Sequence, residues 1–298
     1  MPTDEITAAA AGSWTLGDRT VHRMGFGSMR ITANPDRERA IAVLRRAVEL
    51  GVNHIDTAAF YVSPGGTLRV GTGPARYATE LIRAALAPYP EELVIATKVG
   101  FGYDPATGFT EAATAAQLRA QVEDNLRRLG RDRLDVVNLR LSRGPGPAPL
   151  VERFGALAEL RAAGLIRHLG LSGARPEHLD EVAGIAPVVC VQNNYGVDAY
   201  REQDAFVRAC GERGIAYVPF FALAGTNRER GASAAQGAAV EAVARAHGVT
   251  PQQVRLAWTL HQGPHVLAIP GTGDPAHLEE NITAAALRLT PEDLTHLG

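Results

Sequence analysis

The chain has 298 residues, of which 46% are hydrophobic, so it can bury a large core. Its 30 Lys and Arg against 32 Asp and Glu give a formal net charge of −2, which argues against nucleic acid and anionic membranes as partners. Two cysteines without a CxxC motif, and no signal-peptide or long apolar run, predict a cytoplasmic protein without a membrane segment.

The first predicted element is a β-hairpin at residues 13–21. The segment reads SWTLGDRTV, with Gly17 and Asp18 as the turn. Because it precedes anything that looks like a core strand, we expect it to cap the fold that follows.

A strand followed by a helix then recurs eight times. The first unit is a strand at 24–29, and a helix that starts near 34–36 and ends at 50. The other units pair 54–58 with 77–86, 93–98 with 115–129, 136–141 with 150–163, 168–172 with 176–183, 188–192 with 202–213, 216–220 with 234–247, and 266–270 with 275–285. Residues 251–262 predict one further helix on the outside.

Eight such units with Val-, Ile- and Leu-rich strands predict an α/β fold, a closed (β/α)8 TIM barrel with an N-terminal hairpin cap, over a single domain of residues 1–298. The alternative is an open doubly wound sheet. It would be favoured by a GxGxxG turn, and Gly25-Phe26-Gly27 does not continue in that way.

Functional side chains of a barrel gather where the strands end. Polar or aromatic residues stand at six predicted strand ends, and we expect them to converge on one rim: Asp56, Lys98, Arg140, Ser172, Gln192 and Tyr217. Taken singly, each has a structural explanation, such as a turn cap for Asp56 or a rim position for Lys98.

Asp56, Lys98 and the nearby Tyr61 together form a recognisable acid-base group. A lysine ammonium favours the phenolate, so Lys98 should lower the pKa of Tyr61 from its usual value of about 10, while Asp56 holds Lys98. Tyr61 could then donate a proton to a carbonyl near neutral pH.

The loop after the last predicted strand reads Gly271-Thr272-Gly273 and leads into a helix near Pro275. Helix N-termini at this place in barrels bind phosphates, and a cofactor phosphate is favoured here over a substrate phosphate. The nine histidines show no HExxH-type spacing, so no metal is predicted, and His54 shares the strand parity of Asp56 as an interior structural residue.

These segments, in order, resemble the aldo-keto reductase superfamily: GVNHIDTAAFY, LVIATKVG, GLIRHLGLSG, VCVQNNY, IAYVPFF and VLAIPGTGDPAHLEENI. The resemblance implies a barrel that binds NADPH in an extended pose and passes a hydride between nicotinamide and a carbonyl or alcohol carbon of a small molecule. It also implies that Tyr61 is the general acid, that Lys98 modulates its pKa and that Asp56 orients Lys98.

The resemblance further implies a set of cofactor contacts. Ser172 and Gln192 would bind the nicotinamide carboxamide, Tyr217 would stack on the ring, and Thr272, Glu280 and Asn281 would bind the adenosine phosphate. The remaining implied cofactor positions are Gly27, Ser28, Met29, Asp56, Pro219, Gly271, Gly273 and His277.

The chain departs from the family pattern at strand four, which ends in Arg140 where the family carries a histidine. A guanidinium can donate several hydrogen bonds, stabilise an oxyanion or bind a carboxylate, so we expect a preference for acidic substrates if Arg140 faces the pocket. The alternative is a rim salt bridge. Gly173 replaces a common Asn, Gly271 and His277 replace basic residues that grip the 2′-phosphate, and residues 62–76 form a long possible lid.

Three other functions stay open from the sequence. A lysine at a strand end also suits a Schiff-base aldolase, although an ammonium paired with Asp56 is a poor nucleophile. The same scaffold could reduce an imine or a conjugated double bond, or serve as a cofactor-binding subunit without turnover. Retention of Asp56, Tyr61 and Lys98 together favours the carbonyl reductase.

Overall fold

The computed structural model describes residues 5–68, 70–104, 106–142, 144, 146–223 and 237–298. At its centre lies a seven-stranded parallel sheet in the order β13-β12-β11-β10-β7-β4-β3. The strands are β3 (Phe26–Gly27), β4 (His54–Asp56), β7 (Val94–Val99), β10 (Leu134–Arg140), β11 (Ile166–Ser172), β12 (Val188–Gln192) and β13 (Ala216–Tyr217).

Residues 265–270 close this sheet into a barrel. Val266 forms a parallel bridge with Tyr217 of β13, and Ala268 forms one with Met24, just before β3. The predicted eighth strand is therefore present as two bridges and not as a full strand. The closure is tight, because a Cβ added at Gly271 would lie 2.4 Å from the carbonyl oxygen of Gly27.

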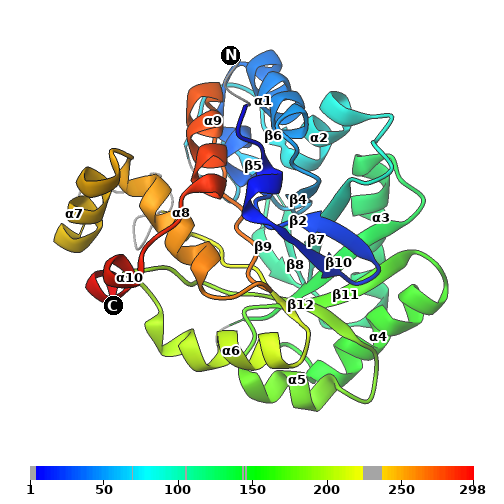
Figure 1. The fold of residues 1–298 in the computed structure, drawn as a ribbon. Helices are drawn as coiled ribbons and strands as arrows, with labels where there is room; N and C mark the ends of the chain where they lie inside the picture. The colour runs from blue at the N-terminus through cyan, green and yellow to red at the C-terminus, as the bar shows by residue number, and fades with distance from the viewer. Residues whose placement is uncertain (1–4, 69, 105, 143, 145, 224–236) are drawn as a thin grey trace.

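The helices surround the barrel (Figure 1). They are α1 (Arg37–Glu49), α2 (Ala78–Leu86), α3 (Ala115–Leu129), α4 (Leu150–Ala162), α5 (Pro176–Val182), α6 (Asp204–Glu212), α7 (Ala238–His247), α8 (Pro251–His261), α9 (Pro275–Thr283) and α10 (Pro291–Leu297), with 3-10 turns η1 (Ala8–Ala11), η2 (Met29–Ala33), η3 (Arg201–Gln203) and η5 (Ala284–Ala286). The predicted TIM barrel and its additional helix α8 are confirmed, whereas α10 was not predicted. The predicted helix start at Ala234 lies outside the described residues.

Several helices begin where the sequence supplies a cap. Asp36 accepts hydrogen bonds from two backbone amides of the first turn of α1, and Thr114 and Thr250 form capping boxes at α3 and α8. Such caps satisfy amides that have no partner within the helix and fix where it starts.

Three hairpins lie outside the barrel sheet in the described part of the chain. The predicted N-terminal one consists of β1 (Ser13–Leu16) and β2 (Arg19–His22), and its Leu16 and Val21 pack into the barrel interior, so it plugs one end (Figure 1). A second, β8 (Phe101–Asp104) with β9 (Gly108–Glu111), was not predicted. A third, β5 (Val62–Ser63) with β6 (Arg76–Tyr77), joins the two ends of the predicted lid segment 62–76.

Strand side chains alternate between two cores. In β7, Val94 and Ala96 belong to the barrel interior, whereas Ile95 and Val99 belong to the layer between strands and helices. The same parity puts Lys98 on the interior side, at the end of its strand. Parity therefore decides which strand-end side chains can reach the mouth of the barrel.

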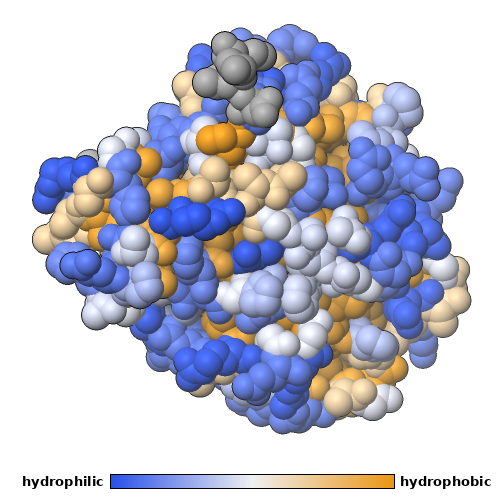
Figure 2. Space-filling view, viewed as in Figure 1, coloured by the Kyte–Doolittle hydropathy of each residue, from blue (hydrophilic) through white to orange (hydrophobic). Residues whose placement is uncertain are grey.

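No described helix is long and apolar enough to cross a bilayer. On the face that carries the N-terminal hairpin, hydrophilic residues are interspersed with small apolar areas (Figure 2).

Candidate active site

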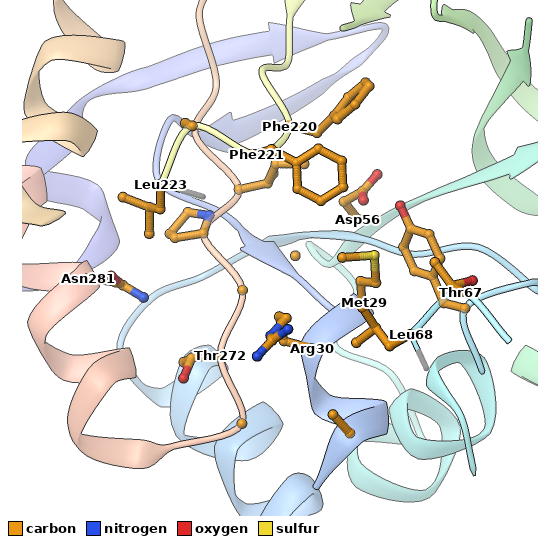
Figure 3. A pocket seen from close by; sticks show the side chains of 18 of the residues that line it. Met29, Arg30, Asp56, Thr67, Leu68, Phe220, Phe221, Leu223, Thr272 and Asn281 are labelled. Atoms are coloured by element: carbon orange, nitrogen blue, oxygen red, sulfur yellow. The ribbon is translucent and has the colours of Figure 1, made fainter. Parts of the chain in front are cut away.

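A cavity of about 1090 Å³ opens at the carboxyl ends of the strands. It extends from Asp56 at one end to Thr272 and Asn281 at the other, with Met29 between them (Figure 3). The cavity is elongated because strand ends and the loop before α9 contribute to the same continuous wall.

Asp56 and Lys98 form a buried ion pair at the floor of this cavity. Lys98 Nζ lies 2.6 Å from Asp56 Oδ1 and donates a second hydrogen bond, of 3.0 Å, to the carbonyl of Thr57. The two side chains are only 4% and 6% exposed. Burial lowers the pKa of Lys98, but Asp56 and Tyr61 together raise it by more, so the ammonium is retained.

Tyr61 lies beside this pair, in the loop after β4. Its backbone amide donates to Ala58 and its carbonyl accepts from Ala78, which fixes the loop. Lys98 Nζ lies 4.7 Å from the centre of the phenol ring. The prediction that the pKa of Tyr61 falls below its usual value is wrong, because burial raises that pKa by more than Lys98 lowers it.

Arg140 faces the cavity from the end of β10. Its Nη1 donates a 3.1 Å hydrogen bond to Ser172 Oγ on β11, and its guanidinium carbon lies 5.2 Å from the centre of the Phe220 ring. Gly173 has a φ of +74°, and a Cβ at this residue would come within 3.1 Å of Arg140 Nη1. The absence of a side chain at Gly173 therefore leaves space for the Arg140 guanidinium. Of the two predicted orientations of Arg140, the structure shows the one toward the pocket.

The far end of the cavity is built around the start of α9. Asp274 caps this helix through the amides of Ala276 and His277, and its own amide donates to Thr272 Oγ1 at 3.0 Å. Arg39 pairs with Asp274 at 2.5 Å.

Two predicted contacts and one unpredicted one complete that end. Glu280 accepts a 2.6 Å hydrogen bond from Thr250 Oγ1, and Asn281 is buried against the cavity. Arg30, which was not predicted, also lines the cavity and is drawn between Thr272 and Met29 in Figure 3.

The cavity collects all but three of the predicted site residues. Those that line it are Gly27, Met29, Asp56, Tyr61, Lys98, Arg140, Ser172, Pro219, Gly271, Thr272, Gly273, His277, Glu280 and Asn281. Ser28 and Gln192 do not line it. Ser28 is fully buried, and Gln192 Nε2 donates a 2.8 Å hydrogen bond to Asp56 Oδ1, so their cofactor contacts stay predictions.

The third exception is Tyr217, whose predicted place on the rim is wrong. Its neighbours Ala216 and Val218 face the barrel interior, so Tyr217 points outward. There it is fully buried, packs edge-on against Tyr195 and Phe206, and donates a 2.8 Å hydrogen bond from its hydroxyl to Gln203. A side chain on that side of the strand cannot reach the cavity.

Aromatic side chains line much of the cavity. They are Phe60, Phe101, Phe109, Phe220 and Phe221. Phe60 packs edge-on against Tyr61, at 5.4 Å between ring centres, and against Phe109 of β9, at 6.5 Å. Strand parity would have found Phe220, which has the parity of Ala216 and Val218.

No group of three or more His, Cys, Asp or Glu within the described ranges could hold a metal ion. His54 is buried in the barrel, where its Nδ1 lies 3.1 Å from the carbonyl of His22. Burial lowers its pKa to about 4. It is therefore a neutral interior histidine, as its strand parity predicts.

The barrel, the cavity at its strand ends and the buried Asp-Lys pair beside a tyrosine define an oxidoreductase of the aldo-keto reductase type. Residues 23–297 match the model of the aldo/keto reductase family, so the chain belongs to this family.

Individual relatives agree with this assignment. The chain is 42% identical to pyridoxine 4-dehydrogenase from Escherichia coli, over 97% of this chain and 98% of the relative. It is similar to the thermostable aldo-keto reductase Tm1743 in complex with the inhibitor epalrestat (TM-score 0.77, 30% identity, 96% and 98% of the two chains). It is also similar to a Klebsiella pneumoniae aldo/keto reductase in complex with NADP and acetate (TM-score 0.76, 25% identity, 96% and 93%).

Proposed function

We propose that this protein binds NADPH and reduces a carbonyl group of a small molecule to an alcohol, or runs the reverse oxidation, with Tyr61 as the general acid or base. The observation that carries the proposal is the position of Lys98. Its ammonium is held by Asp56 at 2.6 Å and lies 4.7 Å from the Tyr61 ring, at the floor of the cavity.

The lining of the cavity fits NADPH. Its far end combines Arg30, Arg39 and His277 with the start of α9, and cations beside a helix N-terminus suit phosphate groups. Arg30 supplies positive charge that Gly271 lacks, which supports NADPH over NADH, whereas the charge of Arg39 is offset by its ion pair with Asp274. An elongated cavity of about 1090 Å³ has room for an extended cofactor and a small substrate.

The residues around Tyr61 have distinct roles in this reaction. The hydride is supplied by NADPH when it is bound. Tyr61 is protonated at neutral pH, because burial raises its pKa, and it gives this proton to the carbonyl oxygen. Lys98 stabilises the phenolate that remains, and Asp56 holds Lys98 in place.

Arg140 takes the place of a neutral imidazole on strand four. It is fixed by Ser172 and faces the cavity, from where its N–H groups can orient the carbonyl and stabilise developing negative charge. A guanidinium cannot release a proton near neutral pH, so proton transfer is left to Tyr61.

A narrower substrate class is favoured by the aromatic wall. Five phenylalanines line the cavity, and flat aromatic rings pack well against such side chains. Together with 42% identity to a pyridoxine 4-dehydrogenase over nearly the full length, this supports an aromatic aldehyde such as pyridoxal as substrate.

The other functions have less support. A Schiff-base aldolase needs a neutral lysine, whereas the pKa of Lys98 is raised by Asp56. Reduction of an imine or a conjugated double bond would use the same residues and is distinguished by its substrates. A cofactor-binding subunit without turnover would not need Tyr61 and Lys98 together.

Consumption of NADPH with pyridoxal, benzaldehyde, a cyclic imine and an α,β-unsaturated ketone tests the proposal. We expect turnover of the aldehydes and a loss of roughly 100-fold or more in kcat for Tyr61→Phe, with NADPH binding retained in a fluorescence titration. Binding of NADPH without turnover of any carbonyl would support the non-catalytic subunit instead.

A further inference from the structure

Below Lys98, the barrel interior holds a chain of polar side chains with no role in the proposed reaction. Cys190 Sγ donates to Asn138 Oδ1 at 3.0 Å, and Asn138 Nδ2 donates to Gln192 Oε1 at 3.4 Å. Gln192 Nε2 then donates to Asp56 Oδ1 at 2.8 Å. Cys190, Asn138 and Gln192 are each 1% exposed, so water does not compete for these bonds.

The direction of this chain follows from its chemistry. The ionised Asp56 carboxylate only accepts hydrogen bonds, so Gln192 presents its nitrogen to Asp56 and its oxygen to Asn138. The nitrogen of Asn138 then faces Gln192, and its oxygen faces the thiol of Cys190, which donates to it. Any other orientation of the Asn138 amide would lose the bond to Gln192.

Asn138 is a polar residue in the largely apolar barrel interior, and a glycine on the adjacent strand makes room for it. Other interior positions nearby are aliphatic, as at Ala96 on β7 and Val136 on β10 itself, whereas Asn138 is polar. Gly170 on the adjacent strand makes the room, since a Cβ there would lie 2.0 Å from Asn138 Oδ1 and 2.7 Å from Cys190 Sγ. Glycine in a strand and a polar residue in a core both lower stability, and such departures mark functional positions.

Asp56 Oδ1 receives two donors, Gln192 Nε2 at 2.8 Å and Lys98 Nζ at 2.6 Å. Both bonds are strengthened by the charge of the ionised carboxylate, and their directions restrict where the carboxylate can turn. The position of Lys98 beside the Tyr61 ring therefore depends on a group held from below by Gln192.

We propose that Asn138 is a positioning residue for the acid-base group: acting through Gln192 and Asp56, it keeps Lys98 against Tyr61. This rests on the proposed function of Tyr61. Without Asn138, Gln192 turns, Asp56 loses a donor, and Lys98 moves with Asp56 away from the phenol. The phenolate then loses support from Lys98.

The test is Asn138→Leu, which keeps the side-chain size and removes both hydrogen bonds. Lys98 lowers the pKa of Tyr61, so a displaced Lys98 lets that pKa rise further. We expect kcat for pyridoxal reduction to fall by about tenfold, with KM and NADPH affinity changed less than about twofold. The high-pH limb of the kcat profile should move upward by roughly half a pH unit or more, because Tyr61 stays protonated to higher pH.

Asn125→Leu is the matched control. Asn125 is equally buried at 1% exposure, accepts from Thr97 Oγ1 and donates to the carbonyl of Gln121, but it lies on α3, where it faces the outer side of β7. Loss of the Asn125 hydrogen bonds destabilises the fold but leaves the contacts of Asp56, Lys98 and Tyr61 unchanged. We expect its pH midpoint to equal that of the wild-type protein.

The inference is overturned if Asn138→Leu keeps the wild-type pH midpoint and loses activity only in proportion to its folded fraction. If that variant does not fold, the pair Cys190→Ala and Cys190→Ser decides. Cys190→Ser keeps a donor to Asn138 and should retain the pH midpoint of the kcat profile, whereas Cys190→Ala should shift this midpoint upward. Equal midpoints in the two variants would refute the positioning role of Asn138. Failure of the proposed function looks different, because then the wild-type protein itself lacks turnover or Tyr61→Phe retains it.

Discussion

At the scale of single residues, the site depends on two buried charges that compensate each other. Lys98→Met removes the ammonium, so the buried Asp56 carboxylate keeps its hydrogen bond from Gln192 but has lost its cationic partner. Breaking such a pair costs roughly 3–5 kcal/mol, so we expect a fall of that size in the free energy of unfolding, measured with urea. The double variant Asp56→Asn with Lys98→Met should recover most of the stability while remaining inactive. Equal stability of the single and double variants would contradict this account.

Arg140 sets a second expectation at this scale, on substrate charge. A guanidinium in the cavity can bind a carboxylate, and hydrogen bonds between charged groups contribute about 1.5–3 kcal/mol. We expect Arg140→Gln to lower kcat/KM for 4-carboxybenzaldehyde roughly tenfold more than for 4-methylbenzaldehyde. Arg119→Gln, on the outer surface of α3, is the control. An equal loss for both aldehydes would leave Arg140 a general role in catalysis and none in charge selection.

The sequence predicts the identity of the charged site residues better than their energetics. Asp56, Lys98 and Arg140 stand at strand ends with interior parity, and both properties can be read from the sequence. Strand parity also places Tyr217 outside the barrel and Phe220 on the side that faces the cavity. The direction of the Tyr61 pKa could not be predicted, because it depends on how deeply the packed loop buries the phenol.

At the scale of elements, the unpredicted hairpin β8–β9 provides part of the aromatic wall. Tyr103 on β8 pairs with Phe109 on β9, their rings lie 5.3 Å apart, and the Tyr103 hydroxyl donates to the carbonyl of Gly65 in the 62–76 segment. Phe109 is 53% exposed and lines the cavity, so its ring has free surface that an aromatic substrate could cover.

Phe109→Ala should therefore select between substrates. We expect kcat/KM for benzaldehyde to fall roughly fivefold to tenfold, and that for propanal to change less than about twofold, since aromatic contacts contribute about 0.5–1.5 kcal/mol beyond buried area. Val151→Ala on α4 is the control, as Val151 is also exposed, at 43%, but does not line the cavity. A parallel loss for both aldehydes would argue against an aromatic subsite.

The elements that differ from their prediction, or were not predicted, are those with the weakest local pattern. The eighth strand, 266–270, ends at Pro270, which has no amide hydrogen to give a ladder, and it is held by two isolated bridges. The strands of β8–β9 are four residues long, and all but one of the β8 positions are partly exposed, so no buried alternating face marks them in the sequence. The long, apolar βα units were predictable because their strands and helices pack against the barrel interior or against the layer between strands and helices. This packing leaves a regular spacing of apolar residues in the sequence.

At the scale of the whole molecule, a neutral histidine inside the barrel ties stability to pH. His54 lies within the plugged end, and a Cβ added at Gly25 would be 2.1 Å from its ring, so the ring fills a space that glycine leaves. Burial lowers its pKa from 6.5 to about 4. The unfolded chain therefore takes up the proton at a higher pH than the folded protein does.

This difference sets the sign of the pH dependence. The contribution of His54 is complete above about pH 6.5 and is lost as the pH falls from there toward about 4, by roughly 3 kcal/mol in all. We expect the free energy of unfolding of the wild-type protein to fall by that much more than that of His54→Phe between pH 7 and pH 4, in urea titrations. His178 and His265, whose pKa values burial also lowers, act in the same sense but are common to both proteins and cancel. His296→Phe, at an exposed position, should follow the wild type, and parallel curves for His54→Phe would show that the barrel accepts the imidazolium.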